Sequence, residues 1–423
     1  MRVLWVVNTL LNDIKNYLGI NNLYGGGWME AYLSQLKKHN IEISIVTPYD
    51  CDEIKKIEID NVNYYLIPGG ELVKLGKKII LEDIWSQVLL NTNPDIIHIH
   101  GTEYAHSISL FNVRGKIPIV TSIQGLLSVY ERYYFGGIDK KTILKFTAIK
   151  DVLKNTTIFS QKKEFMRRSF FEKTIINKSD AIIGRTDWDY SNVKEIKNDC
   201  IYYTCHESLR KHFYLADKWD VSNIEKNSIF LSQATYPIKG FHFLIKAINL
   251  LRNDFPNIKL YVAGSDIYST TNFLRTNSYA RYIKGLIEDY SLKDNIEFLG
   301  IIDEKQMAEI LRKVNVFVQS SAIENSPNAL GEAQLIGTPC VSSFVGGVSN
   351  MINHRFSGML YNYQEYAVLA YYISEIFNDD KFADILSKNG IKVATKRHDE
   401  VTNGMQLINI YKNLIDCSEH TKH

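Results

Sequence analysis

The sequence contains few cysteines, and none of them lies in a disulfide or metal-binding pattern. Its five cysteines, with no C-x-x-C pair among them, are Cys51, Cys200, Cys205, Cys340 and Cys417. An odd, scattered set argues against the disulfide framework of a small secreted domain. Cys200, Cys205 and His206 have the spacing of half a metal site, but no second pair is nearby. We therefore expect thiols in the core or facing solvent, and no bound metal.

Long apolar runs are also missing. No stretch approaches the length of about 18 apolar residues that a membrane-spanning helix needs. The N-terminal run Met1–Val7 is too short for the apolar region of a signal peptide, and it leads directly into polar residues. We therefore expect a first strand there and a cytoplasmic protein.

The chain has no strong excess of charge, no internal repeat and no low-complexity tract. Its formal net charge of +2 gives no bulk attraction to nucleic acid, so we expect no nucleic-acid partner. A length of 423 residues exceeds what one hydrophobic core comfortably serves, which favours two domains.

Both halves of the sequence alternate strand and helix patterns. In the first half, strand patterns at Val3–Val7, Ile41–Thr47, Asp95–His100 and Ile117–Ile123 accompany a helix pattern at Trp28–Lys38. In the second half, strand patterns at Ser228–Ser232, Lys259–Ala263, Ile296–Leu299, Val314–Gln319 and Cys340–Ser343 are separated by helix patterns at His242–Asp254, Arg275–Tyr290 and Glu304–Lys313. This alternation predicts two α/β domains with parallel sheets.

The most informative segment follows the strand pattern Val314–Gln319. A helix is expected there, with Ser326 as its N-cap, Pro327 in its first turn and Gly337 as its C-cap. Glu324 lies just before this helix and Glu332 lies over a turn inside it. Open α/β sheets bind ligands at the carboxyl ends of their strands, and free helix N–H groups attract phosphate. Carboxylates beside a phosphate would repel it unless they bind uncharged hydroxyls of a ribose or a sugar.

The same segment matches one family pattern in order: Glu324, Asn325-Ser326-Pro327-Asn328, Glu332, Gly337-Thr-Pro339 and Val345-Gly-Gly-Val348. It resembles the E-x7-E signature of the retaining glycosyltransferases of family 4. Those enzymes have the GT-B fold, with two Rossmann-like domains facing across a cleft and a C-terminal helix that returns to the first domain. The resemblance implies that Glu324 lies by the donor sugar and the reacting phosphate, and that Glu332 binds the nucleotide ribose. It also implies that Asn325, Ser326 and Asn328 contact the nucleotide sugar.

The resemblance suggests where the two domains divide. Residues 1–215, together with a C-terminal helix within residues 401–423, are expected to form an acceptor-side domain. Residues 216–400 are expected to form the nucleotide-sugar-binding domain. The helix pattern Val401–Ile415 is the candidate for the returning helix.

A lysine near the start of the second half extends the resemblance. Tyr236-Pro-Ile-Lys239-Gly240 is similar to the family's Lys-Gly pair, whose lysine neutralises the donor diphosphate as it leaves. The family usually has an arginine five residues earlier, where this chain has Ala234. Arg185 and Arg210 are candidates for the missing charge.

The first half matches the family by layout more than by motif. Family members commonly have a histidine beside the donor sugar where this chain has Gln124, which cannot take a proton but can hydrogen-bond a sugar hydroxyl. His98 and His100 share one face of a strand, and His100 is a candidate for a role on the acceptor side, the alternative being a satisfied core residue. Gly26, within the run Gly25–Gly27, and Gly264 follow strands and would let the backbone approach the donor.

Residues 138–180 are strongly basic in an otherwise balanced chain. They hold eleven Lys and Arg against five Asp and Glu, interleaved with phenylalanines. A basic amphipathic stretch of this kind predicts a peripheral contact with an anionic membrane, at the inner membrane face. The alternative is a solvated helical face that packs its aromatic residues on the first domain.

The sequence therefore predicts a retaining, metal-independent glycosyltransferase of surface polysaccharide biosynthesis. It would use a nucleotide sugar as its donor substrate, a glycan or lipid-linked molecule as its acceptor, and no bound cofactor. One alternative is another GT-B enzyme, such as an epimerase or a phosphorylase, and the latter would carry pyridoxal phosphate on a lysine. A second alternative is a non-catalytic paralogue that binds a partner transferase, which Gln124 and Ala234 keep open.

Overall fold

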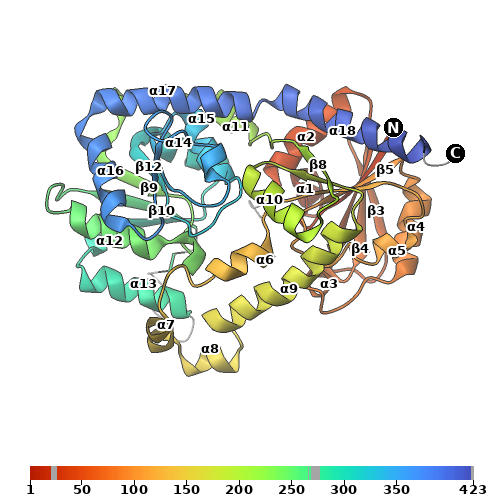
Figure 1. Ribbon diagram of the computed structural model, residues 1–423, viewed down its shortest axis with the longest axis horizontal. Helices are drawn as coiled ribbons and strands as arrows, with labels where there is room; N and C mark the ends of the chain where they lie inside the picture. The colour runs from red at the N-terminus through yellow and green to blue at the C-terminus, as the bar shows by residue number, and fades with distance from the viewer. Residues whose placement is uncertain (21–25, 265, 268–276, 421–423) are drawn as a thin grey trace. The chain divides into compact units, whose positions relative to one another are not determined.

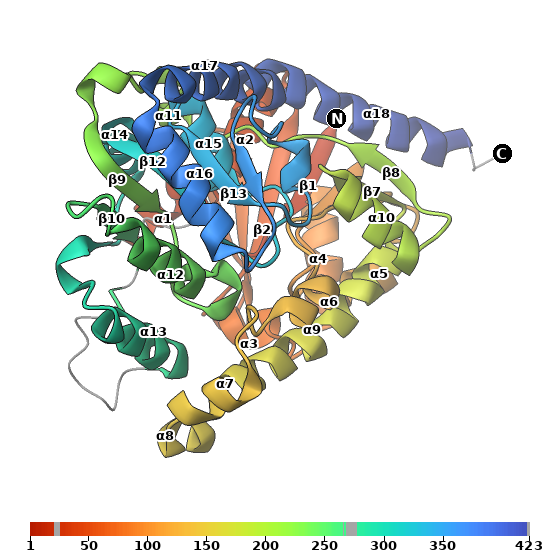
Figure 2. The same cartoon turned by 60° about the vertical axis from the view of Figure 1, so that its left-hand side comes forward.

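The computed structural model describes residues 1–20, 26–264, 266–267 and 277–420. The chain divides into two compact units (Figures 1 and 2). The first comprises Met1–Val129, Phe165–Leu209 and His398–His423, and the second comprises Tyr130–Glu164 and Arg210–Arg397. Gly25, Arg275 and residues 421–423, which fall in segments considered above, lie outside the described residues.

An eight-stranded sheet forms the centre of the first unit. Its strand order is β3-β4-β2-β1-β5-β6-β7-β8, and all neighbouring pairs are parallel except β3 and β4. The strands are β1 (Arg2–Val6), β2 (Glu42–Tyr49), β3 (Lys55–Ile59), β4 (Val62–Pro68), β5 (Ile96–His100), β6 (Ile119–Ser122), β7 (Ala181–Gly184) and β8 (Ile201–Thr204). The central strands β5 and β6 are buried along their whole length, and they combine isoleucine and valine with buried polar residues such as His98 and Thr121.

Helices flank this sheet, and the last of them comes from the end of the chain. They are α1 (Asn12–Tyr17), α2 (Gly27–Lys38), α3 (Gly70–Lys74), α4 (Glu82–Thr92), α5 (Leu110–Val113), α6 (Leu127–Tyr130), α9 (Ile158–Lys178), α10 (Asp187–Ile196) and α18 (Glu400–His420). Because α18 belongs to the first unit and packs on α2, the expected return of the C-terminal helix to the first domain is confirmed.

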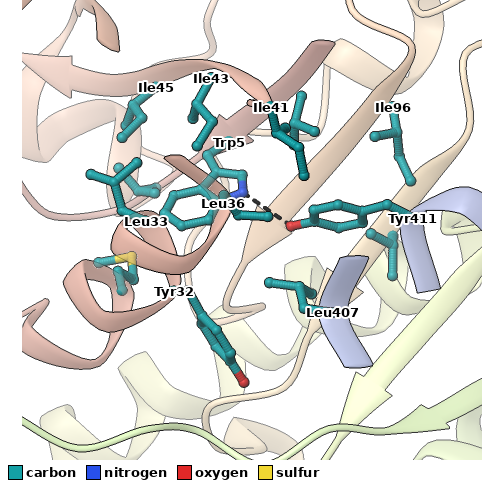
Figure 3. Packing of buried hydrophobic residues seen from close by; sticks show 14 of the residues in the cluster. Trp5, Tyr32, Leu33, Leu36, Ile41, Ile43, Ile45, Ile96, Leu407 and Tyr411 are labelled. Carbon is teal, nitrogen blue, oxygen red and sulfur yellow. Dashed lines mark hydrogen bonds between the residues drawn. The ribbon is translucent and has the colours of Figure 1, made fainter. Parts of the chain in front are cut away.

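Tyr411 on α18 lies at the centre of the core that this helix closes (Figure 3). Its hydroxyl accepts a hydrogen bond from Trp5 Nε1 at 3.0 Å and lies 2.5 Å from His98 Nδ1. Leu407 from α18 and Leu36 from α2 pack in the same buried cluster. The helix is therefore held by both apolar packing and a buried polar centre.

A six-stranded, all-parallel sheet forms the centre of the second unit. Its order is β11-β10-β9-β12-β13-β14. The strands are β9 (Glu225–Leu231), β10 (Lys259–Ala263), β11 (Ile296–Gly300), β12 (Val314–Gln319), β13 (Cys340–Ser343) and β14 (Met359–Tyr361). The helices are α7 (Lys140–Phe146), α8 (Ile149–Leu153), α11 (Lys211–Leu215), α12 (Phe241–Leu251), α13 (Ser278–Asp289), α14 (Glu304–Lys313), α15 (Asn328–Ile336), α16 (Tyr366–Asn378) and α17 (Asp380–Arg397).

The architecture confirms the predicted two-domain α/β class with parallel sheets. The strands at Lys259–Ala263, Val314–Gln319 and Cys340–Ser343 have the predicted bounds, and the other predicted strands differ only near their ends. The antiparallel pair β3–β4 and the short strands β7, β8 and β14 are additions that the sequence patterns did not indicate. Across the described residues, no helix combines the length and the apolar character needed to cross a bilayer.

We predict that Tyr411→Phe lowers the free energy of unfolding by roughly 1–3 kcal/mol, because it leaves Trp5 Nε1 and His98 Nδ1 without their buried partner. Urea denaturation of the purified chain measures the change. Tyr17→Phe on α1, where the tyrosine is 65% exposed, is the matched control and should leave the midpoint unchanged. Equal midpoints for Tyr411→Phe and the wild type would show that α18 does not depend on this polar centre.

Candidate active site

The loop between β12 and α15 carries Glu324 at the carboxyl end of the second sheet. β12 is buried throughout and lies between β9 and β13. Two glycines hold the loop by close backbone approach. A Cβ on Gly346 would lie 1.9 Å from the carbonyl oxygen of Glu324, and a Cβ on Gly240 would lie 1.8 Å from that of Ser320. Both glycines have positive φ, at 51° and 66°, so no other residue fits either position without strain.

Lys239 and Glu324 form an ion pair in this loop region. Lys239 Nζ lies 2.6 Å from Glu324 Oε1, and Gln319 Nε2 donates to the same oxygen at 3.0 Å. Burial lowers the pKa of Lys239, but the Glu324 carboxylate and Tyr236 raise that pKa by more, so the ammonium stays charged. The structure therefore brings together two of the residues that the sequence assigned to catalysis.

Glu332 is paired with a residue that the sequence had assigned elsewhere. Both of its carboxylate oxygens accept from Arg210, from Nε at 2.7 Å and from Nη2 at 2.7 Å. Burial raises the pKa of Glu332, and the hydrogen bonds and charge of Arg210 lower it only in part. Arg210, a candidate for the charge missing at Ala234, is thus hydrogen-bonded to Glu332, the carboxylate that the resemblance assigns to the ribose.

The N-terminus of α15 carries the remaining residues of the motif. Pro327, not Ser326, occupies the N-cap position, and no side chain caps the helix, so the predicted N-cap is wrong by one residue. Ser326 Oγ instead accepts from Arg397 Nη2 at 3.2 Å, which removes it from the cap. Asn325 N donates to Tyr130 Oη at 3.1 Å. Asn328 Oδ1 is buried and finds no hydrogen-bond partner within the described part of the chain. The predicted C-cap, Gly337 with φ of 92°, is confirmed.

Gly26 and Gly264 both adopt the left-handed conformation, each in its own unit. Gly26, with φ of 93°, is the N-cap of α2. Gly264, with φ of 101°, follows β10, and a Cβ there would meet nothing within 4 Å among the described residues. None of the described residues therefore blocks an approach to the backbone at Gly264 from that side.

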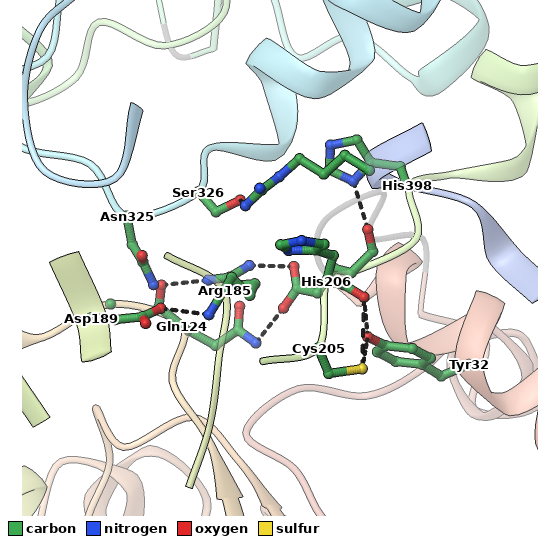
Figure 4. A network of polar contacts seen from close by, with 12 residues as sticks. Tyr32, Gln124, Arg185, Asp189, Cys205, His206, Asn325, Ser326 and His398 are labelled. Carbon is green, nitrogen blue, oxygen red and sulfur yellow. Dashed lines mark hydrogen bonds and ion pairs between the residues drawn. The ribbon is translucent and has the colours of Figure 1, made fainter. Parts of the chain in front are cut away.

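Gln124, which follows β6, belongs to a buried polar network in the first unit (Figure 4). Its Nε2 donates to Glu207 Oε1 at 2.6 Å, and Arg185 Nη1 lies 2.6 Å from Glu207 Oε2. Arg185 Nη2 also donates to the carbonyl oxygen of Gln124 at 2.8 Å. Glu207 was not predicted as a site residue. No local pattern marks it, because its partners are far away in the sequence.

His98 and His100 lie side by side but differ in their contacts. The rings are 3.8 Å apart between centroids. His98 Nε2 lies 2.6 Å from Ser122 Oγ, its Nδ1 contacts Tyr411, and burial lowers its pKa to about 3. His98 is therefore a satisfied core residue. His100 packs against Trp5 at 4.6 Å, and neither of its ring nitrogens has a hydrogen-bond partner among the residues described.

No group of three or more His, Cys, Asp or Glu is arranged to hold a metal ion in the described ranges. Asp187 and Asp189 form an Asp-x-Asp run, but Asp189 completes the capping box of α10 with Thr186 and accepts a hydrogen bond from Tyr202. The Asp189 carboxylate therefore serves helix α10.

The chain is similar in sequence to known glycosyltransferases. Residues 217–393 match the family model described as glycosyl transferases group 1. The chain is 23% identical over 404 residues to the capsular polysaccharide biosynthesis glycosyltransferase CapM of Staphylococcus aureus. This match covers 92% of this chain and 95% of CapM. Two other curated relatives match at 25% and 24% identity, but the chain spans only 58% and 46% of their length.

Two solved structures share the fold over nearly the whole chain. Sucrose-phosphate synthase from Thermosynechococcus elongatus superposes with a TM-score of 0.72 at 18% identity, covering 99% of this chain and 100% of that one. HepE from Anabaena, whose structure was determined in complex with UDP, superposes with a TM-score of 0.65 at 15% identity, covering 98% and 100%. Residues 217–393 therefore form a group 1 glycosyltransferase domain within a two-domain α/β chain that has the GT-B fold.

Proposed function

We propose that this chain is a retaining, metal-independent glycosyltransferase of polysaccharide biosynthesis. It transfers a sugar from a nucleoside diphosphate sugar to a glycan or lipid-linked acceptor. The observation that carries the proposal is the Lys239–Glu324 ion pair at the carboxyl end of the second sheet, next to the uncapped N-terminus of α15. A cation, a carboxylate and free helix N–H groups in one place suit a diphosphate sugar.

Lys239 stabilises the negative charge that develops on the diphosphate as it leaves. Ala234 supplies no charge, and the two candidate arginines are each paired with a buried carboxylate, Arg210 with Glu332 and Arg185 with Glu207. Lys239 is paired as well, with Glu324. It is the cation that the motif resemblance assigns to the diphosphate, so we give it most of the stabilisation that side chains provide to the leaving group. The leaving phosphate takes the proton of the acceptor hydroxyl, so the reaction needs no protein base at Gln124.

The other motif residues bind and orient the substrates. Glu324 accepts hydrogen bonds from the donor sugar, and Glu332 accepts them from the ribose. The amide of Gln124, oriented by Glu207, contacts a sugar hydroxyl, and His100 lies on the acceptor side. The UDP complex of HepE makes UDP-sugars the first donors to test, and the name of CapM favours a capsule-like acceptor.

Within residues 138–180, we assign the proposed membrane contact to helices α7 (Lys140–Phe146) and α8 (Ile149–Leu153), which we call the tip. Two cations further along the basic stretch make contacts within the protein. Lys162 lies 3.4 Å from Glu131 Oε2, and Arg168 donates to the carbonyl oxygen of Glu103. The tip instead exposes Leu144, Ile149, Val152 and Leu153 by 61–81%, next to the exposed Lys140, Lys141, Lys145 and Lys154. Exposed aliphatic side chains ringed by lysines suit an anionic lipid surface.

We predict different kinetic effects for the two motif glutamates. Glu332→Gln should raise KM for the donor, because the ribose contact forms on binding, whereas Glu324→Gln should mainly lower kcat, because this carboxylate lies by the reacting centre. Steady-state kinetics with the donor identified from a panel of UDP-, GDP- and ADP-sugars measures both. Glu375→Gln, which breaks the exposed pair with Arg355, is the control. Negligible effects of both motif changes would remove the site assignment.

Lys239→Ala should lower kcat by roughly 10²–10³, because a preorganised cation at the leaving group is lost. Lys388→Ala, which removes an exposed lysine paired with Asp384, controls for the loss of an ordinary ion pair and should be silent. Single-turnover kinetics with saturating donor isolates the chemical step. If Lys239→Ala turns over at the wild-type rate, the diphosphate binds elsewhere.

The tip of α7 and α8 should direct binding to vesicles that contain phosphatidylglycerol. Wild-type sedimentation with such vesicles should fall as salt rises, because exposed charges are screened over about 8 Å at physiological ionic strength. Ile149→Asp with Leu153→Asp should abolish binding. The control pair, Leu90→Asp with Leu215→Asp, changes leucines that are 82% and 73% exposed elsewhere and should leave binding intact. A wild type that ignores these vesicles at low salt contradicts the membrane contact.

A further inference from the structure

The Arg210–Glu332 pair has the geometry of a fixed fork. Arg210 precedes α11, and its Nε and Nη2 each donate to one oxygen of Glu332 at 2.7 Å. The Arg210 guanidinium is itself held in place, 4.8 Å from the ring of Phe213 and with Nη2 3.1 Å from Met307 Sδ. The Glu332 side chain is only 4% exposed. The orientation of this carboxylate is therefore set by Arg210.

Among the described residues, two charged groups shift the pKa of Glu332: the cation Arg210 and the acid Glu304. Burial raises the pKa of Glu332, and Glu304 on α14 raises it further, whereas Arg210 lowers it. Arg210 in turn faces Asp303 and Glu304 as well as Glu332. Without Arg210, a buried carboxylate next to a second acid would take up a proton at a higher pH.

We propose that Arg210 is a positioning residue of the nucleotide site, which keeps Glu332 ionised and aligned to receive both hydroxyls of the ribose. The inference rests on the proposed function and deepens it, since no sequence motif assigns this role to Arg210. It replaces the earlier expectation that Arg210 supplies charge to the leaving group.

The stoichiometry of hydrogen bonds supports this role. An ionised carboxylate offers about four lone-pair sites, and the fork of Arg210 uses two of them, one on each oxygen. The remaining two match the two adjacent hydroxyls of a ribose. A protonated Glu332 would use one oxygen as a donor and could no longer accept from both hydroxyls. A lysine would not reproduce the planar fork, so it would keep the charge but lose the alignment.

The test measures how the affinity for UDP, GDP and ADP depends on pH, by isothermal titration calorimetry. In Arg210→Gln, the pH below which affinity is lost should lie roughly one to three units higher than in the wild type, and raising the pH should restore binding. Arg210→Lys should show a smaller shift but weaker affinity at every pH. Arg210→Gln combined with Glu332→Gln should bind weakly with no such recovery, which separates Glu332 from titration of the nucleotide.

A matched control breaks a similar fork away from the motif. Arg355 pairs with Glu375 through Nη1 at 3.0 Å and Nη2 at 2.8 Å in the same unit. Arg355→Gln should leave both the affinity and its pH dependence as in the wild type. If Arg210→Gln behaves like this control, or loses affinity equally at every pH, the inference is overturned.

A second arm needs no nucleotide. With Arg210 removed, the pKa of Glu332 in the folded state rises further above its unfolded value, so stability is greatest at low pH and is lost as pH rises through the folded pKa. The unfolding midpoint of Arg210→Gln, relative to that of the double variant, should therefore fall as the pH rises through the raised pKa of Glu332 in the folded variant. If the difference between these two unfolding midpoints does not change with pH, the inference is overturned. A wild type that binds none of the three nucleotides contradicts the proposed function instead, and this second experiment still decides whether Arg210 keeps Glu332 ionised.

Discussion

The ion pair between Lys239 and Glu324 joins two loops that leave neighbouring strands, β9 and β12, at the carboxyl edge of the second sheet. Taking two charges out of water costs several kcal/mol per ion, so such a pair persists only with good geometry. The backbone supplies that geometry: Ala322 N donates to the Ile238 carbonyl at 2.6 Å, and Ser320 Oγ donates to that of Lys239 at 2.9 Å. The proposed chemistry depends on this junction, because it fixes a cation and a carboxylate before any substrate binds.

Pairing of buried charge recurs among the candidate residues. Glu332 has Arg210, and Glu207 has Arg185, so each of these glutamates is balanced by its own cation. Balanced pairs leave little net positive charge to attract a diphosphate. Lys239 is paired with Glu324 in the same way, so in the proposed site the attraction comes mainly from the free N–H groups at the start of α15, where no side chain forms a cap. Under the proposed function, these N–H groups make up for the arginine that Ala234 replaces.

Local sequence patterns predicted the elements whose residues are buried on both faces, such as β12, and the left-handed stop of α15 at Gly337. The glutamate motif and Lys239 were identified by resemblance, and their roles stay predictions. The structure shows that Lys239 and Glu324 form an ion pair. The partners of Gln124 and Glu332 could not be predicted, because Glu207 and Arg210 lie 83 and 122 residues away from them. The exposure of the aliphatic side chains of α7 and α8 also could not be predicted, because composition does not reveal which side chains pack inward.

Hydrogen–deuterium exchange of the backbone amides, with and without a saturating UDP-sugar, tests the central claim most directly. The claim is that the donor binds where Lys239, Glu324 and the N-terminus of α15 meet. It predicts that donor slows exchange in peptides that cover residues 236–241 and 320–332. Donor binding that slows exchange only in other peptides, or leaves both of these segments unprotected, would contradict it.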